Sequence, residues 1–229
     1  MAEFEIADIS CQLIPKPALY LMEAILPSDL IATVNSYIDD LRGSARDHSG
    51  MLVGQIRRDP RSAQLALNLA DKVPSGLAAV VAEIGRQYIA AIGYSAVVNA
   101  NDMWTVNEGD YNPLHDHGGK TLLGLSSILY LKVPAVIAQK PAVLHGGAPK
   151  LHMASGNCDG FTQLVWGATG MRDFSLLRPP TQQYIKPEEG KLLVFPNWLL
   201  HRVEPFFGEG ERRTLSCNMD VVFDEPDWY

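Results

Sequence analysis

Three consecutive residues that can bind a metal, His115, Asp116 and His117, lie in the stretch NPLHDHGG. In a β-strand alternate side chains point to the same face, so His115 and His117 would face one way and Asp116 the other. Two imidazoles on one face can hold a single metal ion. Without a metal, the pair would be two partly buried or exposed histidines, and Asp116 an exposed or hydrogen-bonded carboxylate.

A third histidine, His201, ends a second informative stretch within EGKLLVFPNWLLHRVEP. This stretch predicts a strand, a Phe-Pro corner and a short element that ends at the histidine. An imidazole that arrives from a distant strand would complete one face of a metal's coordination sphere. The other histidines, His48, His145 and His152, lie in loop-like sequence without a partner at ligand spacing. We expect them to be solvated, with His145 or His152 able to make a contact at the rim.

An arginine begins a polar row on the predicted strand in GERRTLSCNMDVVF. Alternation divides the strand into two faces, one with Arg212, Thr214, Ser216 and Asn218 and the other with Arg213, Leu215, Cys217 and Met219. A polar row that starts with arginine is costly inside a barrel unless an anion is held there. A guanidinium can donate two parallel hydrogen bonds to a carboxylate, so Arg212 is the candidate anion-binding residue. The alternative, a surface arginine on an edge strand, fits Arg213 better.

The elements that must position these residues change in type along the chain. Residues 18–26 predict a strand, and a helix follows from Ser28, because apolar residues recur at helical spacing up to Leu41. A second helix is predicted over residues 75–92, ended by Gly93. The polar, glycine-containing residues 48–62 predict a loop or short hairpin that could reach over a pocket.

From about residue 97, short β-type runs alternate with Gly, Pro and Asn. The runs that predict strands are residues 97–107, 125–134, 161–167, 182–187, 191–196 and 212–223. Residues 140–181 are rich in Gly and Pro and predict long loops on the rim. The sequence therefore predicts one α+β domain, in which residues 1–96 form a helical and strand elaboration and residues 97–229 form a jelly-roll core.

Composition excludes several classes of protein. The 229 residues carry a net charge of −7, which argues against a binder of nucleic acid or anionic membranes. A small molecule or a neutral or basic polypeptide is a better partner, and the oligomeric state is not predicted. The three cysteines lack CxxC spacing, which argues against a disulfide framework or a zinc knuckle. Without a leader-like or membrane-spanning run, we expect a soluble, cytoplasmic protein.

The order of these motifs resembles the 2-oxoglutarate and iron(II)-dependent oxygenase superfamily, in particular a bacterial and phage-type branch related in fold to prolyl hydroxylases. The resemblance is carried by H-x-H at 115–117, by P-x-x-G-x-L-x-x-F-P-x-W-L-x-H-x-V-x-P over 187–205, and by E-R-x-T-x-S-x-N over 211–218. It spans roughly residues 103–222. The motif around the last histidine and the arginine is its most specific part.

The resemblance implies a double-stranded β-helix that binds Fe(II) through His115, His201 and the residue two positions after the first histidine. In most of the superfamily that residue is Asp or Glu, whereas here it is His117. Strand alternation favours His117 as the third ligand. A bulge after Pro113 would instead turn Asp116 inward, so both alternatives stay open.

The resemblance also implies that Arg212 binds the distal carboxylate of 2-oxoglutarate and that Thr214 supplies a hydroxyl beside it. Tyr130 and Ser126 are expected to reach the same co-substrate. The implied reaction consumes dioxygen and 2-oxoglutarate and hydroxylates a peptidyl or small-molecule substrate. Two alternatives remain: a cupin-like metalloenzyme that does not use 2-oxoglutarate, and an inactive relative that only binds a metal or ligand. Three imidazoles would also suit Zn(II).

Overall fold

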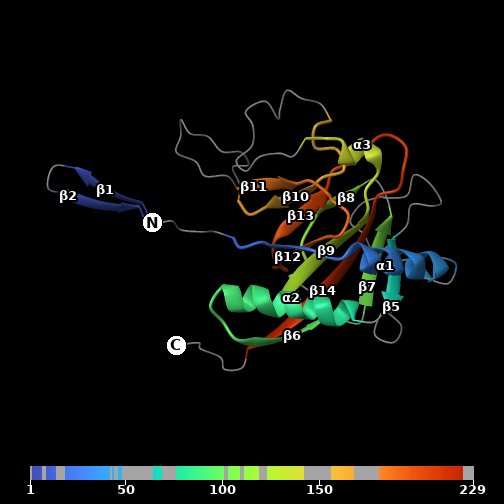
Figure 1. Ribbon diagram of the computed structural model, residues 1–229, viewed down its shortest axis with the longest axis horizontal. Coiled ribbons are helices and arrows are strands. Elements are labelled where there is room, and N and C mark those ends of the chain that lie inside the picture. Colours follow the sequence, from blue (N-terminus) through green and yellow to red (C-terminus); the bar gives the residue numbers. More distant parts are fainter. Residues whose placement is uncertain are drawn as a thin grey trace.

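The protein forms two antiparallel β-sheets, with helices on the outer face of the larger one (Figure 1). The computed structural model describes residues 2–6, 9–13, 19–41, 43, 46–47, 64–68, 76–100, 103–108, 111–118, 123–141, 156–167 and 181–223. Near the N-terminus, β1 (Ala2–Ile6) pairs with β2 (Ile9–Leu13). The predicted loop at 48–62 and three histidines, His48, His145 and His152, lie outside the described residues.

The larger sheet has eight strands, in the order β3-β12-β9-β14-β7-β5-β4, with β6 also paired to β14. Their bounds are β3 (Met22–Ile25), β4 (Arg46–Asp47), β5 (Gln64–Asn68), β6 (Ala96–Ala100), β7 (Met103–Glu108), β9 (Gly124–Lys132), β12 (Lys191–Pro196) and β14 (Arg213–Phe223). The long strand β14 pairs with three others, β9, β7 and β6, and therefore organises the sheet.

The smaller sheet has four strands, in the order β11-β10-β13-β8. Their bounds are β8 (Asn112–His115), β10 (Thr162–Val165), β11 (Gln182–Ile185) and β13 (Leu200–Val203). Apolar side chains of both sheets meet in one buried cluster, which includes Tyr130 of β9, Leu164 of β10 and Phe195 of β12. The two sheets are therefore packed face to face, as in a jelly roll.

Two long helices cover the other face of the larger sheet (Figure 1). In α1 (Ser28–Leu41), Ile31, Val34 and Ile38 are buried at helical spacing. In α2 (Leu77–Ala91), the buried residues include Val81 and Tyr88. The short α3 (Ala135–Ala138) follows β9. No helix among the described residues is both long and apolar enough to span a membrane.

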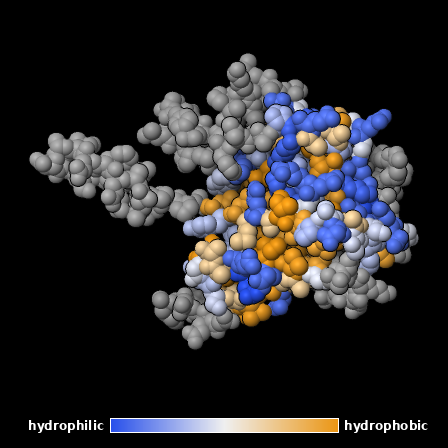
Figure 2. All heavy atoms as spheres, in the orientation of Figure 1, coloured by the Kyte–Doolittle hydropathy of each residue, from blue (hydrophilic) through white to orange (hydrophobic). Residues whose placement is uncertain are grey.

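Strand β9 shows why the apolar residues 128–131 do not alternate with polar residues. Leu125, Leu129 and Leu131 belong to the cluster beneath the helices, whereas Ile128 and Tyr130 belong to the cluster between the sheets. Both faces of this strand are buried, so both select apolar side chains. The surface is mixed, with apolar residues near the middle of the face in Figure 2 and hydrophilic residues around them.

The predicted α+β class with a double-stranded β-helix core is confirmed. Both predicted helices form, and the second ends before Gly93, whose φ of 94° suits glycine. The predicted strand at 97–107 is in fact two strands, β6 and β7, which pair with successive parts of β14. Within the predicted rim segment 140–181, the structure describes β10, the strand expected from the run at 161–167. The division of the domain at residue 97 stays a prediction.

Candidate active site

The inner face of the smaller sheet brings two of the predicted metal ligands together. β13 pairs with β8 so that His201 lies directly opposite His115. Their ring centroids are 4.3 Å apart. His201 is 5% exposed, and its ring makes a T-shaped contact with the ring of Phe195, at a centroid distance of 5.1 Å. The pairing of two short strands thus places two imidazoles, 86 positions apart in the sequence, side by side.

Both imidazoles are held by the same kind of hydrogen bond. His115 Nδ1 lies 2.6 Å from the carbonyl oxygen of Pro113, and His201 Nδ1 lies 2.9 Å from that of Leu199. A carbonyl oxygen only accepts, so a neutral ring in this contact carries its proton on Nδ1. The lone pair of Nε2 is then available in each ring to bind a metal, and the backbone fixes the ring's orientation.

His117 completes a cluster of three imidazoles. It follows the end of β8, and its backbone N–H donates to the carbonyl oxygen of Asn197 at 2.8 Å. Its ring centroid is 5.1 Å from that of His115 and 5.2 Å from that of His201. One nitrogen from each ring lies within 4.8 Å of the others, so small side-chain rotations would bring all three onto one ion.

Asp116, the alternative third ligand, is not part of this cluster. Its side chain is exposed, and its Oδ1 accepts a hydrogen bond from the backbone N–H of Gly118 at 3.1 Å. This contact is an Asx turn, in which a carboxylate caps the backbone two residues on. The geometry supports His117 over Asp116 as the third ligand.

Burial and like charge keep the innermost histidine neutral. The pKa of His201 is lowered from 6.5 to about 3, first by burial and then by the charge that His115 would carry. The hydrogen bond to Leu199 and the carboxylate of Asp116 act in the opposite direction, and His117 lowers the pKa further. At neutral pH the ring is therefore neutral, which is the form that binds metals.

Arg212 lies between the sheets with part of its guanidinium unsatisfied. It is 2% exposed, and its Nε donates to the carbonyl oxygen of Gly160 at 3.1 Å. Among the described residues, its buried Nη2 has no hydrogen-bond partner. Burial lowers the pKa of this group, yet a guanidinium stays charged in proteins. A buried cation with a free donor is costly unless an anion binds it, and a carboxylate matches its geometry.

Tyr130 and Thr214 flank this arginine. The two residues are direct partners in the pairing of β9 with β14, and both are buried. The Tyr130 ring centroid is 5.7 Å from Arg212 Cζ, and its hydroxyl donates to Thr162 Oγ1 at 2.6 Å. Burial raises the pKa of Tyr130 to about 12, against the opposite effect of Arg212, so the phenol stays protonated at neutral pH. A phenol, two threonines and a guanidinium are thus buried beside one another, next to the apolar cluster between the sheets.

Ser126, the fourth predicted co-substrate residue, lies four residues before Tyr130 on β9 and is therefore further from Arg212. It pairs with Asn218, and its Oγ lies 3.0 Å from Asn218 Oδ1. Ile128 separates it from Tyr130 on the same face of β9. The structure therefore brings Arg212, Tyr130 and Thr214 together and places Ser126 in a second polar pair on the same face.

Residues 102–218 match the family model described as a 2OG-Fe(II) oxygenase, where 2OG stands for 2-oxoglutarate. This match covers just over half of the chain and includes all seven predicted site residues. The chain belongs to the 2OG-Fe(II) oxygenase family. The family is named for the two cofactors predicted from the motifs, iron(II) and 2-oxoglutarate, and the three-histidine cluster could hold the iron.

Solved structures show the same fold as this oxygenase. A Pseudomonas putida prolyl-4-hydroxylase is 14% identical, with 90% of this chain and 93% of that chain covered and a TM-score of 0.52. The α-ketoglutarate-dependent carbocyclase SnoK of nogalamycin biosynthesis is 12% identical over 89% and 81%, with a TM-score of 0.56. A Trichoplax adhaerens prolyl hydroxylase is 13% identical over 90% and 84%, with a TM-score of 0.51. No curated protein matches the sequence.

The expectation that Arg213 of the oxygenase is a surface residue is wrong. Its side chain is 0% exposed, its Nε donates to Glu211 Oε1 at 2.8 Å, and its Nη2 donates to Asp39 Oδ1 at 2.6 Å. Strand alternation correctly separates it from Arg212, but the face that it occupies is covered by α1. The alternation of residues along a strand does not show that a helix covers one face. Here the carboxylate partner, Asp39 of α1, lies 174 positions away in the sequence.

Sequence reasoning also missed Thr162 of the oxygenase, whose hydroxyl accepts a hydrogen bond from the hydroxyl of Tyr130. The residue is 0% exposed and begins β10. A polar residue at the start of the apolar run FTQLVWG was the available signal, although a strand-initial threonine is common for other reasons. Gly160, whose carbonyl binds Arg212, has a φ of 77° and leaves no room for a side chain beside Ile137.

Proposed function

We propose that this oxygenase is a 2-oxoglutarate- and Fe(II)-dependent dioxygenase that hydroxylates a peptidyl or small-molecule substrate. His115, His117 and His201 hold the iron, and Arg212 binds the distal carboxylate of 2-oxoglutarate. Thr214 and Tyr130 contribute hydroxyl groups to the same pocket, and Ser126 lies further along its wall. The observation that carries the proposal is the buried Arg212 Nη2, which has no partner among the described residues. Arg212 contacts Tyr130 and His201 contacts Phe195, and both of these aromatic residues belong to the cluster between the sheets.

The chemistry balances with one oxidant and two substrates. When bound, iron and 2-oxoglutarate would activate dioxygen, which is the oxidant, so that 2-oxoglutarate, dioxygen and a substrate C–H give succinate, carbon dioxide and a C–OH group. The protein's own residues bind and orient the reactants and exclude water. Three neutral imidazoles give this site one negative charge less than two histidines with a carboxylate. We therefore expect weaker iron retention and a shifted redox potential relative to such sites.

Two substrate classes are compatible with the fold. The Trichoplax adhaerens enzyme is a prolyl hydroxylase in complex with a peptide fragment of a hypoxia inducible factor, whereas SnoK acts in nogalamycin biosynthesis. These similarities support the fold rather than the substrate. We therefore keep a peptidyl side chain and a small molecule as the two candidates.

An anaerobic titration tests the proposal. Metal-free protein is loaded with Fe(II) and then titrated with 2-oxoglutarate, and the weak visible metal-to-ligand band of a bidentate keto acid is recorded. We expect the band to saturate, and admission of air to form succinate. Succinate in place of 2-oxoglutarate is the control, because it lacks the keto group and should give no band.

The three-histidine set also favours a second candidate, a metalloenzyme or binding protein that does not use 2-oxoglutarate. Imidazole-only sites suit Zn(II), and a cupin-like site would use dioxygen directly. This candidate leaves the buried charge of Arg212 without a ligand. Tight metal binding with neither a band nor succinate would support it and would overturn the dioxygenase proposal.

A further inference from the structure

A β-bulge lies between the two residues proposed to bind 2-oxoglutarate. The pairing of β9 with β14 runs evenly from Asp220 opposite Gly124 to Thr214 opposite Tyr130. The next residue of β14, Arg213, pairs with Lys132, so Leu131 is an extra residue in β9. A bulge of this kind bends the strand and re-aims the side chains beside it. Here those side chains are Tyr130 on β9 and, one residue before Arg213, Arg212.

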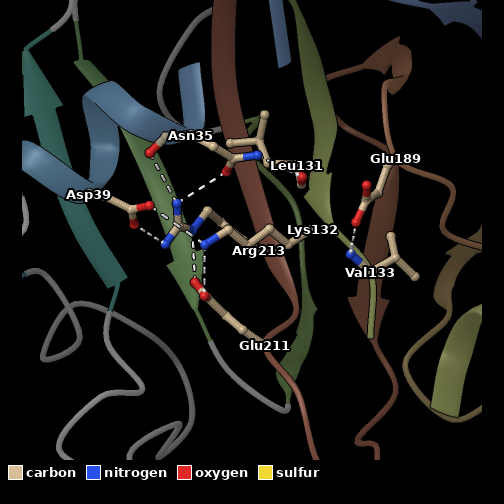
Figure 3. A network of polar contacts seen from close by, with 8 residues as sticks. All are labelled: Asn35, Asp39, Leu131, Lys132, Val133, Glu189, Glu211 and Arg213. Carbon is tan, nitrogen blue, oxygen red and sulfur yellow. Dashed lines mark hydrogen bonds and ion pairs between the residues drawn. The ribbon is translucent and has the colours of Figure 1, made fainter. Parts of the chain in front are cut away.

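Asn35 of α1 binds both sides of this bulge (Figure 3). Its Nδ2 donates to the carbonyl oxygen of Leu131 at 2.9 Å. Its Oδ1 accepts from Arg213 Nη1 at 3.1 Å, and its backbone oxygen lies 3.4 Å from the same nitrogen. One amide therefore connects the bulged residue of β9 to the residue that ends the ladder on β14.

Arg213 is bound at all three guanidinium nitrogens, although no part of its side chain is exposed (Figure 3). Besides Asn35, it contacts Glu211 through Nε and Asp39 through Nη2. Lys132, its partner across the strands, lies 3.1 Å from Glu211 Oε2 and 3.7 Å from Asp39 Oδ2. Two cations and two carboxylates thus interact around the bulge. Such a network favours a single conformation of the bulged backbone.

We propose that Asn35 and Arg213 are positioning residues for the co-substrate pocket, which fix the bulge from the helix side of the sheet and thereby orient Tyr130 and Arg212. This inference rests on the proposed binding of 2-oxoglutarate. Neither positioning residue contacts the pocket. They act through the peptide bonds that join Arg213 to Arg212 and Leu131 to Tyr130.

The local backbone explains why Arg212 needs this support. β14 begins at Arg213, so Arg212 lies outside the hydrogen-bonded ladder. Among the described residues, its side chain makes one hydrogen bond, from Nε to Gly160, and its Nη2 has no partner. Because the Arg212 side chain has so few contacts of its own, its orientation depends on how tightly the neighbouring Arg213 is bound. Misplacement by about 1 Å of a group that orients a reactant can cost a factor of about 100.

Asn35→Asp separates positioning from packing. The substitution has the same size and keeps an acceptor for Arg213, but it replaces the donor to the Leu131 carbonyl by a carboxylate oxygen. Val34→Ala is the matched control, because Val34 neighbours Asn35 on α1 and is 1% exposed but belongs to the apolar cluster. Asn35→Ala is a second variant that removes both contacts. For each protein, iron content, thermal unfolding and the anaerobic Kd for 2-oxoglutarate are measured.

We expect both Asn35 variants to retain iron and to raise the Kd for 2-oxoglutarate about ten-fold. Val34→Ala should lower the unfolding temperature, because it removes buried apolar contacts. It should leave the Kd for 2-oxoglutarate within about two-fold, because Val34 belongs to the apolar cluster and is not one of the residues that bind the bulge. The KM for 2-oxoglutarate should rise with the Kd in the Asn35 variants, with a smaller change in kcat.

Two results would overturn the inference. In the first, the wild type binds 2-oxoglutarate but both Asn35 variants bind it as tightly. In the second, Val34→Ala weakens binding as much as they do, so that lost stability explains the effect. A wild-type protein that gives no band at all is a different result, because it removes the proposed function together with this inference.

Discussion

His115 and His201 are direct partners across β8 and β13, and each ring places its Nδ1 beside the carbonyl oxygen two residues earlier in the chain. The same contact in both strands fixes the same tautomer in both rings. Their Nε2 atoms are therefore prepared for a metal by the backbone rather than by other side chains. This arrangement costs little reorganisation when an ion binds.

We expect His115→Ala and His201→Ala each to lose bound iron, because each removes one of the two opposed imidazoles that we propose as ligands. Iron per chain is measured after anaerobic loading with Fe(II) and desalting. Val203→Ala, on the same strand as His201 and 9% exposed, is the control for lost packing and should keep the metal. Unchanged iron stoichiometry in both histidine variants would end the metal-site assignment.

His117 and Asp116 are expected to respond in opposite ways. His117→Ala should lose metal, because its imidazole belongs to the cluster. Asp116→Ala should retain metal and lose about 1 kcal/mol of stability at most, because its exposed carboxylate caps only the N–H of Gly118. The metal content and the urea midpoint of both variants are compared. A structure of the iron-bound protein with an Asp116 oxygen at bonding distance from the metal would contradict this prediction.

Arg212→Ala should keep its iron yet require far more 2-oxoglutarate. A carboxylate that loses a charged partner inside a protein costs on the order of 2–5 kcal/mol, so affinity should fall by roughly 30-fold to several thousand-fold. The anaerobic titration gives the Kd directly, and succinate formation gives the KM. Arg212→Lys should recover part of the loss, because a lysine keeps the charge but not the planar pair of donors.

Arg213→Ala provides the comparison with Arg212→Ala and should lower stability, and because Arg213 is proposed to position Arg212, it should also weaken 2-oxoglutarate binding. It removes a 0% exposed guanidinium from Asp39 and Glu211, but both carboxylates are partly exposed, with side chains 49% and 33% accessible. We expect a loss of about 2–3 kcal/mol, below the usual cost of breaking a fully buried pair. Its effect on 2-oxoglutarate binding should be smaller than that of Arg212→Ala. The reverse ranking would mean that Arg213 is the co-substrate residue.

Metal-free protein should lose stability as the pH falls from 7 to 5. His201 has a pKa of about 3 when folded and 6.5 when unfolded, so between these values the unfolded chain binds a proton that the folded chain does not. Its contribution is complete above pH 6.5 and decreases below it, by about 2 kcal/mol at pH 5. Urea unfolding with a chelator at pH 7, 6 and 5 measures the slope. His201→Gln should show a shallower slope, and an equal slope in both proteins would contradict the assignment.

The sequence by itself determined which side chains share a face. Alternation along a strand is fixed by backbone geometry, so His115 with His117, and Arg212 apart from Arg213, could be predicted from neighbouring residues alone. Helical spacing in the same way predicted the buried face of α1, with Ile31, Val34 and Ile38. The order of the motifs along the chain also predicted the family and its two cofactors, iron(II) and 2-oxoglutarate.

Only the tertiary structure decided what each face meets. Arg213 lies on a face that the sequence leaves open, and its burial follows from α1, which begins 185 positions earlier at Ser28. The bulge at Leu131 arises from the pairing of β9 with β14 and leaves no local pattern. The contact between Tyr130 and Thr162 joins two sheets. Such relations depend on which distant strands pair and in which register, and that choice is made by burial of the whole core rather than by any short stretch of residues.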